Sequence, residues 1–552
     1  MSVVAGSASR WPARLGLRPQ ARVETVALAA SMFFASFANG AFWRAAAAAG
    51  AFDGARGLWV GACVYVAIVA VTFVLLAGLL NRWTLKPLLT ALLLVTAAAT
   101  HFMGQYGVYL DPGMIRNVLQ SDGRESGELL SLGLLPPLLL FGVLPSLLLW
   151  RVRVIEQAWS RALWSRLAAM AAALVLAMLA LLGAFQDISA LMRNHKEMRH
   201  LVTPANYLVS LARVAFDDSA SKVRGRAPIG TDARVAARPA GSKPRLLLIV
   251  VGETARAQNW GLNGYARQTT PELARIGPVN FPDVTACGSS TEVSVPCMFS
   301  PYGRRNYDKR RIQGSESLLN VLEYAGIPTL WRDNQTGCKN VCKGLAFESF
   351  EHDADPDYCN AQGCSDLVML RGLRERLAAQ TGDAVVVLHQ LGNHGPSYYR
   401  RYPPRLRRFA PTCDTNELGR CSREQIVNAY DNALLATDEF LARSIRALAE
   451  DGSRDTALIY VSDHGESLGE NGLYLHGLPY AIAPRTQTRV PMTMWFSPGF
   501  AASRGLDLQC LRREALRPAS HDNLFHSVLG LMQVRTSVYA RELDLFAPCA
   551  PA

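Results

Sequence analysis

Acidic residues and histidines follow three short apolar runs of the sequence, each close to the point where the run ends. Glu253 comes after the first run, His394 after the second, and Asp463 with His464 after the third. Continuous apolar runs of this length are typical of strands buried on both faces of a parallel sheet. Because the carboxyl ends of parallel strands meet at one edge, we expect these side chains to lie close together. The predicted strands are residues 245–251 (RLLLIVV), 384–388 (AVVVL) and 457–461 (ALIYV).

Two carboxylates and an imidazole at one edge of a sheet form a donor set for zinc. Glu253, Asp463 and His464 would supply this set and leave a coordination position open for a nucleophile or a phosphoryl oxygen. Each residue alone also fits an ordinary role. A glutamate after a strand is usually a surface charge or a cap, and an Asp-His pair in a loop is often only hydrogen-bonded. The coincidence of all three favours the metal site.

A segment rich in hydroxyl groups, residues 281–300, is closed by Cys287 and Cys297. If these cysteines are bridged, Thr291 lies midway on a stapled turn that opens a helix, where backbone N–H groups favour a phosphate. A hydroxyl bound to zinc ionises near neutral pH and becomes a competent nucleophile. Thr291 could instead be only a helix N-cap, and Ser289 or Ser290 could serve equally well. Composition alone does not choose between these hydroxyls.

The elements that must position these residues form an α/β domain. Residues 428–448 have the periodicity of an amphipathic helix between the second and third strands, and alternating strands and helices indicate a parallel sheet. Upstream, the first part of residues 187–243 suits a helix lying on a membrane surface. Its later part, rich in Arg, Ala, Pro, Gly and Ser, indicates a flexible linker. We therefore expect three parts, residues 1–186, 187–243 and 244–552.

The first part has the composition of a membrane domain. Half of the 552 residues are apolar, and the apolar residues are concentrated before residue 186. Five stretches reach the roughly 20 residues that cross a bilayer as a helix. Five such runs in succession are not expected from buried helices of a soluble protein. The predicted spans are residues 24–44, 57–80, 87–105, 129–150 and 163–185.

The distribution of charge gives the orientation of these spans. Basic residues gather before the first span, in the second loop and in the fourth loop, which places these segments in the cytoplasm. The third loop is acidic, and an odd number of spans then places everything after residue 185 outside. The basic residues are Arg10, Arg14, Arg18, Arg22, Arg82, Lys86, Arg151, Arg153, Arg161 and Arg166, and the acidic ones are Asp111, Asp122, Glu125 and Glu128.

Cysteine usage supports the same orientation. Of eleven cysteines, Cys63 lies in the second span and the other ten follow residue 280. An even set in an exported domain indicates disulfides, although zinc ligation by Cys338 and Cys342 is an alternative. The closely spaced cysteines suggest the pairs Cys287–Cys297, Cys338–Cys342, Cys359–Cys364 and Cys413–Cys421, which leaves Cys510 for Cys549.

The net charge of +12 could indicate nucleic-acid binding. With this topology it fits basic cytoplasmic loops and a basic surface beside anionic lipid better. The sequence contains no nucleic-acid motif that would support the first interpretation.

Several short motifs, in this order and after five spans, resemble those of the phosphoethanolamine transferases that modify lipid A, including the mobile colistin resistance enzymes. The resemblance covers nearly the whole chain. The motifs are residues 251–256 (VGETAR), 287–291 (CGSST), 294–300 (SVPCMFS), 392–396 (GNHGP), 430–432 (YDN), 462–470 (SDHGESLGE) and 474–477 (YLHG).

The resemblance implies five transmembrane helices and a periplasmic α/β domain of the alkaline-phosphatase and sulfatase type in the bacterial inner membrane. It makes Thr291 the nucleophile and zinc the cofactor, with phosphatidylethanolamine as donor and lipid A as acceptor. Phosphoethanolamine on lipid A lowers the negative charge of the surface and promotes resistance to polymyxins. We expect a monomer. The implied zinc ligands are Glu253, Thr291, Asp463 and His464, and the implied substrate residues are Lys339, His394, Glu466 and His476.

The sequence departs from the family pattern at two positions. Ser289 stands where threonine is usual, which is chemically mild. Glu292 stands beside the nucleophile where a small apolar residue is usual, and it places a negative charge next to an incoming phosphate. This charge puts the rate or the donor preference in doubt more than the class of reaction.

Three rival functions remain open from the sequence. A hydrolase on the same fold is the first, but a sulfatase would need a Cys-x-Pro-x-Arg setting that neither Cys287 nor Cys297 has, and a two-metal phosphatase would need more carboxylates. The second is a transferase that uses a core sugar, heptose or Kdo, as acceptor. The third is a non-catalytic membrane scaffold, which the presence of all four expected zinc ligands disfavours.

Overall fold

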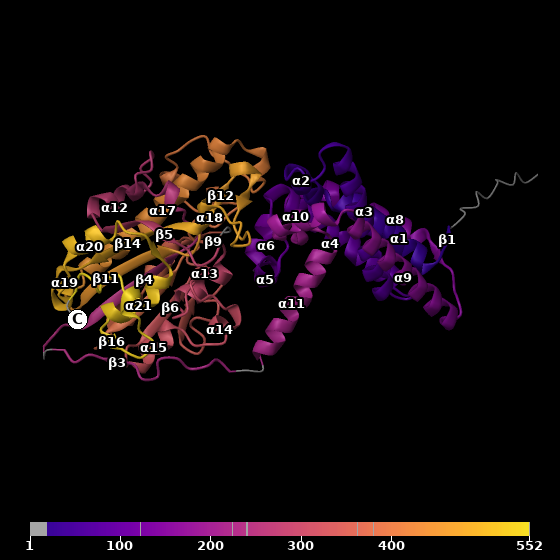
Figure 1. Ribbon diagram of the computed structural model, residues 1–552. Helices are drawn as coiled ribbons and strands as arrows, with labels where there is room; N and C mark the ends of the chain where they lie inside the picture. Colours follow the sequence, from indigo (N-terminus) through magenta and orange to yellow (C-terminus); the bar gives the residue numbers. More distant parts are fainter. Residues whose placement is uncertain are drawn as a thin grey trace, which may run out of the picture. The chain divides into compact units, whose positions relative to one another are not determined.

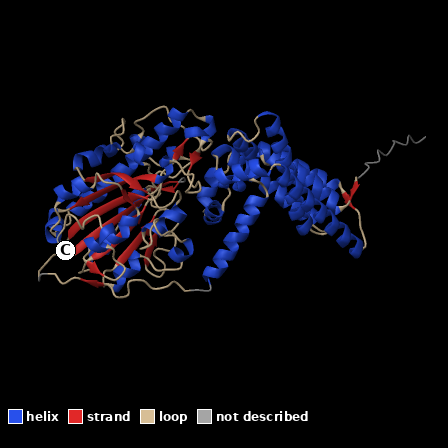
Figure 2. Cartoon of the chain, viewed as in Figure 1, coloured by secondary structure: helices blue, strands red, loops and turns tan. Residues whose placement is uncertain are grey.

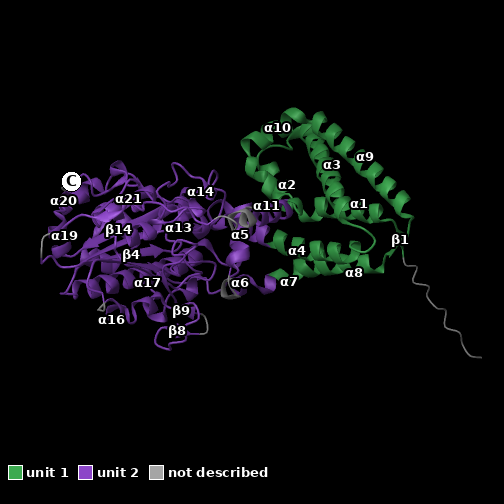
Figure 3. Cartoon of the chain, turned by 90° about the horizontal axis from the view of Figure 1, so that it is seen from below, with its two compact units in different colours: residues 1–101, 134–205 green, residues 102–133, 206–552 purple. Residues whose placement is uncertain are grey.

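The computed structural model describes residues 19–121, 123–222, 225–238, 241–360, 363–378 and 380–550. The chain forms two compact units, one of residues 1–101 and 134–205 and one of residues 102–133 and 206–552 (Figure 3). The loop that follows the predicted third span therefore belongs to the same unit as the sheet. Arg10, Arg14, Arg18 and Asp122, which entered the charge argument, lie outside the described residues.

The first unit is a bundle of helices. Among the described residues, four helices, Gly54–Leu79 (α3), Leu85–Tyr106 (α4), Leu132–Arg151 and Trp159–Gly183 (α9), are long and apolar enough to cross a membrane, and a bent pair makes five if it counts as one span. Only Ala177 of α9 is buried, so its apolar surface faces outward, as a lipid-facing helix requires. The expected helical membrane domain is confirmed.

The bent pair corresponds to the predicted first span. Its two parts, Val23–Ala38 and Gly40–Ala48 (α2), meet at Asn39 with a bend of 52°. The first part comprises the helix Val23–Phe33 (α1) and a π-helical turn, Phe34–Ala38. The Asn39 amide donates to the carbonyls of Phe34, at 2.8 Å, and Thr203, at 3.0 Å. The Asn39 side chain therefore satisfies a carbonyl of the helix before the break and joins the bend to Thr203.

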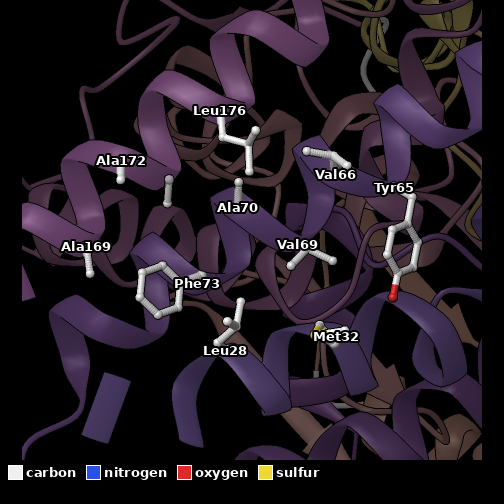
Figure 4. Close-up of a pocket in the computed structure, with 11 residues that line it drawn as sticks. Leu28, Met32, Tyr65, Val66, Val69, Ala70, Phe73, Ala169, Ala172 and Leu176 are labelled. Atoms are coloured by element: carbon white, nitrogen blue, oxygen red, sulfur yellow. The ribbon is translucent and has the colours of Figure 1, made fainter. Parts of the chain in front are cut away.

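An apolar pocket of about 410 Å³ lies between α1, α3 and α9 (Figure 4). Leu28, Phe73 and Leu176 are among the side chains that line it, and the Tyr65 hydroxyl is held by Ser36 at 2.9 Å. The lining contains none of the residues that the sequence assigns to chemistry.

The second unit is built on one eight-stranded sheet, with helices on both faces (Figures 1 and 2). Its three central strands are neighbours and parallel, in the order β11, β4, β10. His389 and Val461 both lie opposite Val251, so the three strands end together. In sheet order the strands are β15 (Ala519–Ser520), β5 (Val279–Thr285), β14 (Arg489–Phe496), β11 (Asp455–Ser462), β4 (Arg245–Gly252), β10 (Ala384–His389), β6 (Thr329–Asp333) and β7 (Ala346–Ser349).

The three predicted strands are therefore confirmed, each with small extensions. Every residue of β4, β10 and β11 is buried. Alternate side chains of β4 enter two separate cores, with Leu247 in one and Leu248 in the other. This two-sided burial explains why the strands are continuously apolar instead of alternating.

Helices cover both cores. Leu318–Tyr324 (α15) and Asp522–Leu531 (α21) pack on the face that includes Leu247. Pro271–Ile276 (α12) and Arg423–Ala449 (α17) pack on the other face. The helix α17 begins five residues before the predicted start, because Ser422 and Gln425 form a capping box there.

The third loop contributes two helices to this unit, Pro112–Gln120 (α5) and Gly123–Leu129 (α6). Asp111 caps α5 by accepting from the backbone N–H of Met114 at 2.8 Å. Buried Glu128 accepts from Arg401 at 2.6 Å, and Arg401 also donates to the carbonyl of His394 at 2.7 Å. Two of the acidic side chains of this loop thus hold it in place within the unit.

Residues of the predicted connector take several forms. The helices Phe185–Asn194 (α10) and Ala205–Lys222 (α11) occupy its first part. In the segment expected to be a flexible linker, Arg234–Val235 (β3) pairs with Val534–Arg535 (β16), and Ile229 is buried in the core.

All five predicted disulfides are present. They join Cys287 to Cys297, Cys338 to Cys342, Cys359 to Cys364, Cys413 to Cys421 and Cys510 to Cys549. Cys63 is free and buried in α3. Because Cys338 and Cys342 are bonded to each other, the alternative of zinc ligation by this pair is excluded.

Candidate active site

Four predicted residues meet at the carboxyl edge of the sheet. Glu253 follows β4, Asp463 and His464 follow β11, and Thr291 is the first residue of the helix Thr291–Met298 (α13). The Thr291 hydroxyl donates to Glu253 Oε2 at 3.0 Å and lies 3.3 Å from His464 Nε2. Asp463 Oδ2 lies 3.4 Å from the same nitrogen. All four side chains are buried, with Thr291 the most exposed at 7%.

The backbone fixes the orientation of His464. Its Nδ1 lies 2.9 Å from the carbonyl of Gly465, which can only accept, so Nδ1 carries a proton that it donates there. The other ring nitrogen, Nε2, then faces Thr291, Glu253 and Asp463. A histidine whose second nitrogen is held by a backbone carbonyl is the usual arrangement of a metal ligand.

Asp463 uses its two oxygens differently. Its Oδ1 accepts from the backbone N–H groups of His464, at 2.7 Å, and Thr254, at 3.2 Å. Its Oδ2 is buried and accepts no hydrogen bond from the described residues. A buried carboxylate oxygen without a donor is costly, so this atom indicates a place for a cation.

The electrostatics support the same conclusion. Burial opposes ionisation of Glu253, yet His464 holds the pKa of Glu253 well below its ordinary value. Burial and the charge of Glu253 raise the pKa of Asp463 to about 6. Burial would lower the pKa of His464, but Asp463 and Glu253 raise it. Two carboxylates that share one imidazole carry an excess of negative charge, which a divalent cation would balance.

The donor set fits zinc. Ligand atoms of Glu253, His464 and His476 lie within 4.8 Å of one another, and Asp463 Oδ2 reaches the same nitrogen of His464. Carboxylate oxygens and imidazole nitrogens are zinc ligands, and Thr291 Oγ1 stands where an exchangeable ligand would be placed. His476 in this group was expected from sequence as a substrate residue, not as a ligand.

The geometry distinguishes between the three candidate hydroxyls. Ser289 Oγ donates to the carbonyl of Leu478 at 2.5 Å. Ser290 is the N-cap residue of α13, and its carbonyl accepts from Ser294 N at 2.9 Å. Of the three, only the Thr291 hydroxyl contacts Glu253 and His464, so the N-cap interpretation of Thr291 is wrong.

The predicted substrate residues lie at different distances from this group. The His476 ring lies 4.2 Å from that of His464 and 5.5 Å from that of His394, centroid to centroid. Buried Glu466 holds His476 Nδ1 at 3.3 Å. Lys339 is partly buried beside the Cys338–Cys342 bridge, and its ammonium donates to the carbonyl and hydroxyl of Thr336, at 3.2 and 2.5 Å.

Sequence reasoning missed Gln335. Its Nε2 donates to Glu253 Oε2 at 3.1 Å, and its side chain is buried. Gln335 follows β6, which is parallel to β10 and ends at the same edge. Its position just after a strand was the available signal.

Two motif residues support the site from behind. The Tyr430 hydroxyl donates to the carbonyl of Thr254 at 2.7 Å and accepts from Arg256 N at 2.9 Å. Arg256 donates to the carbonyl of Glu466 at 3.1 Å and to the carboxylate of Glu470 at 2.9 Å. These contacts fix the turn that carries Glu253 and join it to the loop that carries Glu466.

Two protein-family models match different parts of the chain. Residues 68–218 match the family described as "Phosphoethanolamine transferase EptA/EptB", and residues 245–534 match the family described as "Sulfatase". The second match confirms the expected alkaline-phosphatase and sulfatase type of fold.

Individual relatives extend over nearly the whole chain. Phosphoethanolamine transferase EptA of Escherichia coli (strain K12) is 39% identical over 543 residues, 97% of this chain and 98% of its own. Phosphatidylethanolamine transferase Mcr-1 of Escherichia coli is 41% identical over 437 residues, 75% of this chain and 79% of its own. The solved structure of the integral membrane protein lipooligosaccharide phosphoethanolamine transferase A from Neisseria meningitidis superposes with a TM-score of 0.92 at 36% identity, over 97% of this chain and 100% of that one. The chain belongs to the phosphoethanolamine transferase family.

Proposed function

We propose that this protein transfers phosphoethanolamine from phosphatidylethanolamine to a phosphate of lipid A, through a phosphothreonine intermediate on Thr291. It acts as a monomer in the bacterial inner membrane, with the sheet-containing unit in the periplasm. One observation carries the proposal: the Thr291 hydroxyl, at the start of a helix, lies between Glu253 and His464. The Neisseria relative, whose description names lipooligosaccharide, supports a glycolipid acceptor.

Zinc held by Glu253, Thr291, Asp463 and His464 would lower the pKa of the Thr291 hydroxyl and offset charge on the phosphoryl oxygens. The residues of the chain account for the rest of the first step. As Thr291 Oγ1 attacks phosphorus, its proton passes to Glu253 Oε2, which already accepts it at 3.0 Å. The bond from phosphorus to the diacylglycerol oxygen breaks, and the leaving oxygen takes a proton to give diacylglycerol.

His476 would supply the proton for the leaving oxygen. Glu466 holds its Nδ1, and its ring lies beside that of His464. His394, next to His476, is the second candidate. In the second step an oxygen of the acceptor phosphate attacks phosphorus, the bond to Thr291 Oγ1 breaks, and Thr291 recovers its proton.

The product explains a change at the cell surface. Phosphoethanolamine adds a cationic amine to the acceptor phosphate, so the net negative charge of the surface falls. Cationic peptides such as polymyxins then bind more weakly.

The test is the intact mass of the full-length protein in detergent after incubation with phosphatidylethanolamine. We expect a phosphoethanolamine-sized increase on a peptide that contains Thr291, absent in Thr291→Ala and retained in Ser289→Ala. If diacylglycerol is released while the protein never carries the group, the transfer is direct or the reaction is hydrolysis. A modified Ser289 or Ser290 would assign the nucleophile elsewhere.

A further inference from the structure

A strongly basic segment follows the helix that carries Thr291. Residues 304–311, here called the basic strip, contain Arg304, Arg305, Lys309, Arg310 and Arg311 against a single acidic residue, Asp308. Its last three residues begin the short helix Lys309–Gln313 (α14). None of these side chains takes part in the chemistry described above.

The strip and the residues that follow it contact both the loop before the active-site helix and the helix itself. Arg304 donates to the carbonyl of Cys287 at 3.3 Å, and its guanidinium stacks over the rings of Tyr480, at 3.6 Å, and Tyr307, at 4.9 Å. Two residues after the strip, Gln313 donates to Glu292 Oε1 at 3.3 Å. Helices α13 and α14 pack against each other (Figure 1). The helix that contains the last residues of the strip therefore contacts the helix that begins with Thr291.

The charged ends of the strip are open to solvent. Arg305, Arg310 and Arg311 are exposed. The Arg305 side chain is 43% exposed, and Glu542 lies 3.9 Å away and is itself 68% exposed. An exposed ion pair of this length contributes little to stability. Arg311 stacks over the Tyr302 ring at 3.9 Å, which holds its guanidinium in place without consuming its charge.

The acidic residue within the strip is used locally. Asp308 is the N-cap of α14 and accepts from the backbone N–H of Arg311 at 3.0 Å. The strip therefore carries an excess of positive charge, and its last residues belong to a helix that packs on α13, the helix that begins with Thr291.

The helix that carries Thr291 also packs against a helix from the loop that follows the third predicted span. Helix α5 contacts α13, and its first residue, Pro112, follows the last residue of α4 by six positions. Helices α5 and α14 therefore pack on the same helix, α13.

We propose that the basic strip binds phosphate groups of the acceptor glycolipid and so forms the acceptor subsite. The inference rests on the proposed function and extends it. Phosphatidylethanolamine is zwitterionic and carries little net charge, whereas the acceptor must carry at least one anionic phosphate. Guanidinium groups pair with phosphates in bidentate fashion and attract them over several ångströms. The strip thus distinguishes the second substrate from the first.

The test separates the two half-reactions in the full-length protein. The first readout is the rate at which Thr291 becomes loaded from phosphatidylethanolamine, and the second is the rate at which the loaded protein discharges at varied concentrations of lipid A. In Arg305→Gln/Arg311→Gln we expect loading within about twofold of wild type, and an acceptor KM raised about tenfold or more, from the usual contribution of each basic residue at an anionic lipid surface.

Two variants serve as controls. Arg305→Lys/Arg311→Lys keeps the charge and should retain an acceptor KM within about threefold of wild type. Arg513→Gln/Arg517→Gln removes two arginines that are also exposed but lie outside the strip, and it should leave both half-reactions unchanged. Equal losses in loading and discharge for the strip variant would overturn the proposal.

Vesicle binding separates recognition of the acceptor from attraction to an anionic membrane. If Arg305→Gln/Arg311→Gln loses binding to phosphatidylglycerol vesicles and slows both half-reactions alike, the strip recognises an anionic membrane and not the acceptor. Binding of the Thr291→Ala protein to vesicles that contain lipid A tests the strip even if loading is never seen. In that case a tenfold loss of binding on adding the two strip substitutions supports the subsite, and no loss contradicts it.

Discussion

Arg116 Nε lies 3.8 Å from Glu292 Oε1, and the two side chains are only 3% and 6% exposed. Glu292 is the residue whose charge, next to Thr291, is expected from the sequence to oppose an incoming phosphate. The structure provides its counter-charge from α5, a helix of the loop between two predicted spans. The pair therefore neutralises the acidic departure from the family pattern and joins this loop to the helix that begins with Thr291.

A double-mutant cycle measures this pairing. Arg116→Gln leaves a buried carboxylate without its cation, and breaking a buried pair from one side typically costs about 3–5 kcal/mol. Arg116→Gln/Glu292→Gln removes both charges and should recover most of the stability and of the Thr291 loading rate. Thermal unfolding and loading of the full-length protein check both. If the double variant is as impaired as the sum of the single ones, the two residues act independently.

Gln335 gives a second prediction, because it donates to the same Glu253 oxygen that accepts the hydrogen bond from the Thr291 hydroxyl. Gln335→Leu removes a hydrogen bond to a charged group, which is worth about 1.5–3 kcal/mol. We expect Thr291 loading to slow about tenfold or more, with little change in the KM for phosphatidylethanolamine. Gln258→Leu is the control, because it loses only an exposed hydrogen bond from the Gln258 side-chain amide to the carbonyl of Arg485. A rise in KM at unchanged kcat would instead make Gln335 a donor-binding residue.

The central part of the fold could be predicted because strands buried on both faces are continuously apolar in sequence. The strands β4, β10 and β11 are continuous apolar runs, so their carboxyl ends, and with them Glu253, Asp463 and His464, could be located. Four of the five disulfides join cysteines close in sequence, and the remaining two cysteines then had to pair.

The same criterion misses β6, and with it Gln335. This strand is fully buried but contains Arg332 and Asp333. Arg332 pairs with Glu348 at 2.8 Å, and Asp333 pairs with His389 at 2.7 Å. A buried strand whose charges are satisfied by distant partners does not have an apolar pattern. The Arg116–Glu292 pair was missed for a related reason, since its members are far apart in the sequence and neither has a local signal.

His521 predicts a dependence of stability on pH. Its Nδ1 accepts from Cys287 N at 3.1 Å, and its Nε2 donates to the carbonyl of Ser462 at 2.9 Å, so it bridges the nucleophile loop and β11 in its neutral form. Burial lowers the pKa of His521 from its ordinary 6.5 to about 4. Between these two pH values, His521 is therefore protonated in the unfolded chain and neutral in the folded chain. The contribution of His521 to the free energy of unfolding is fully present above about pH 6.5. It falls by about 3 kcal/mol as the pH drops towards 4.

His521→Gln tests this linkage. Glutamine does not titrate, so the variant should lose part of the slope of unfolding free energy against pH between about 6.5 and 4. His352→Gln is the control, because the His352 side chain is 89% exposed. Chemical denaturation of the full-length protein across this range provides the measurement. Identical slopes for His521→Gln and wild type would show that His521 is not the titrating group.

The Cys287–Cys297 bridge should affect chemistry as well as stability. It closes a loop with a sequence separation of 10 that contains Thr291, and a loop of this size is worth about 3 kcal/mol. Replacing both cysteines by serine should lower the unfolding temperature and slow Thr291 loading. The bridge Cys359–Cys364, with a separation of 5, is the matched control, whose loss should cost about 2 kcal/mol but leave loading intact. Equal effects on loading would remove the special role of the first bridge.

The last prediction concerns the cation that Asp463 Oδ2 indicates. If the site holds zinc, zinc added to chelator-treated protein should raise the unfolding temperature, because a ligand that binds only the folded state stabilises it by about 2.7 kcal/mol at a hundredfold excess over Kd. Glu253→Gln and Asp463→Asn should each weaken this shift, because each removes a carboxylate ligand, and the effect needs no catalytic turnover to be seen. Asp232→Asn is the control. The Asp232 carboxylate accepts a hydrogen bond from Thr536 at 2.7 Å and lies away from the site, so this variant should keep the full shift. If zinc stabilises all three variants equally, it binds elsewhere, and the buried Asp463 oxygen is not a zinc ligand.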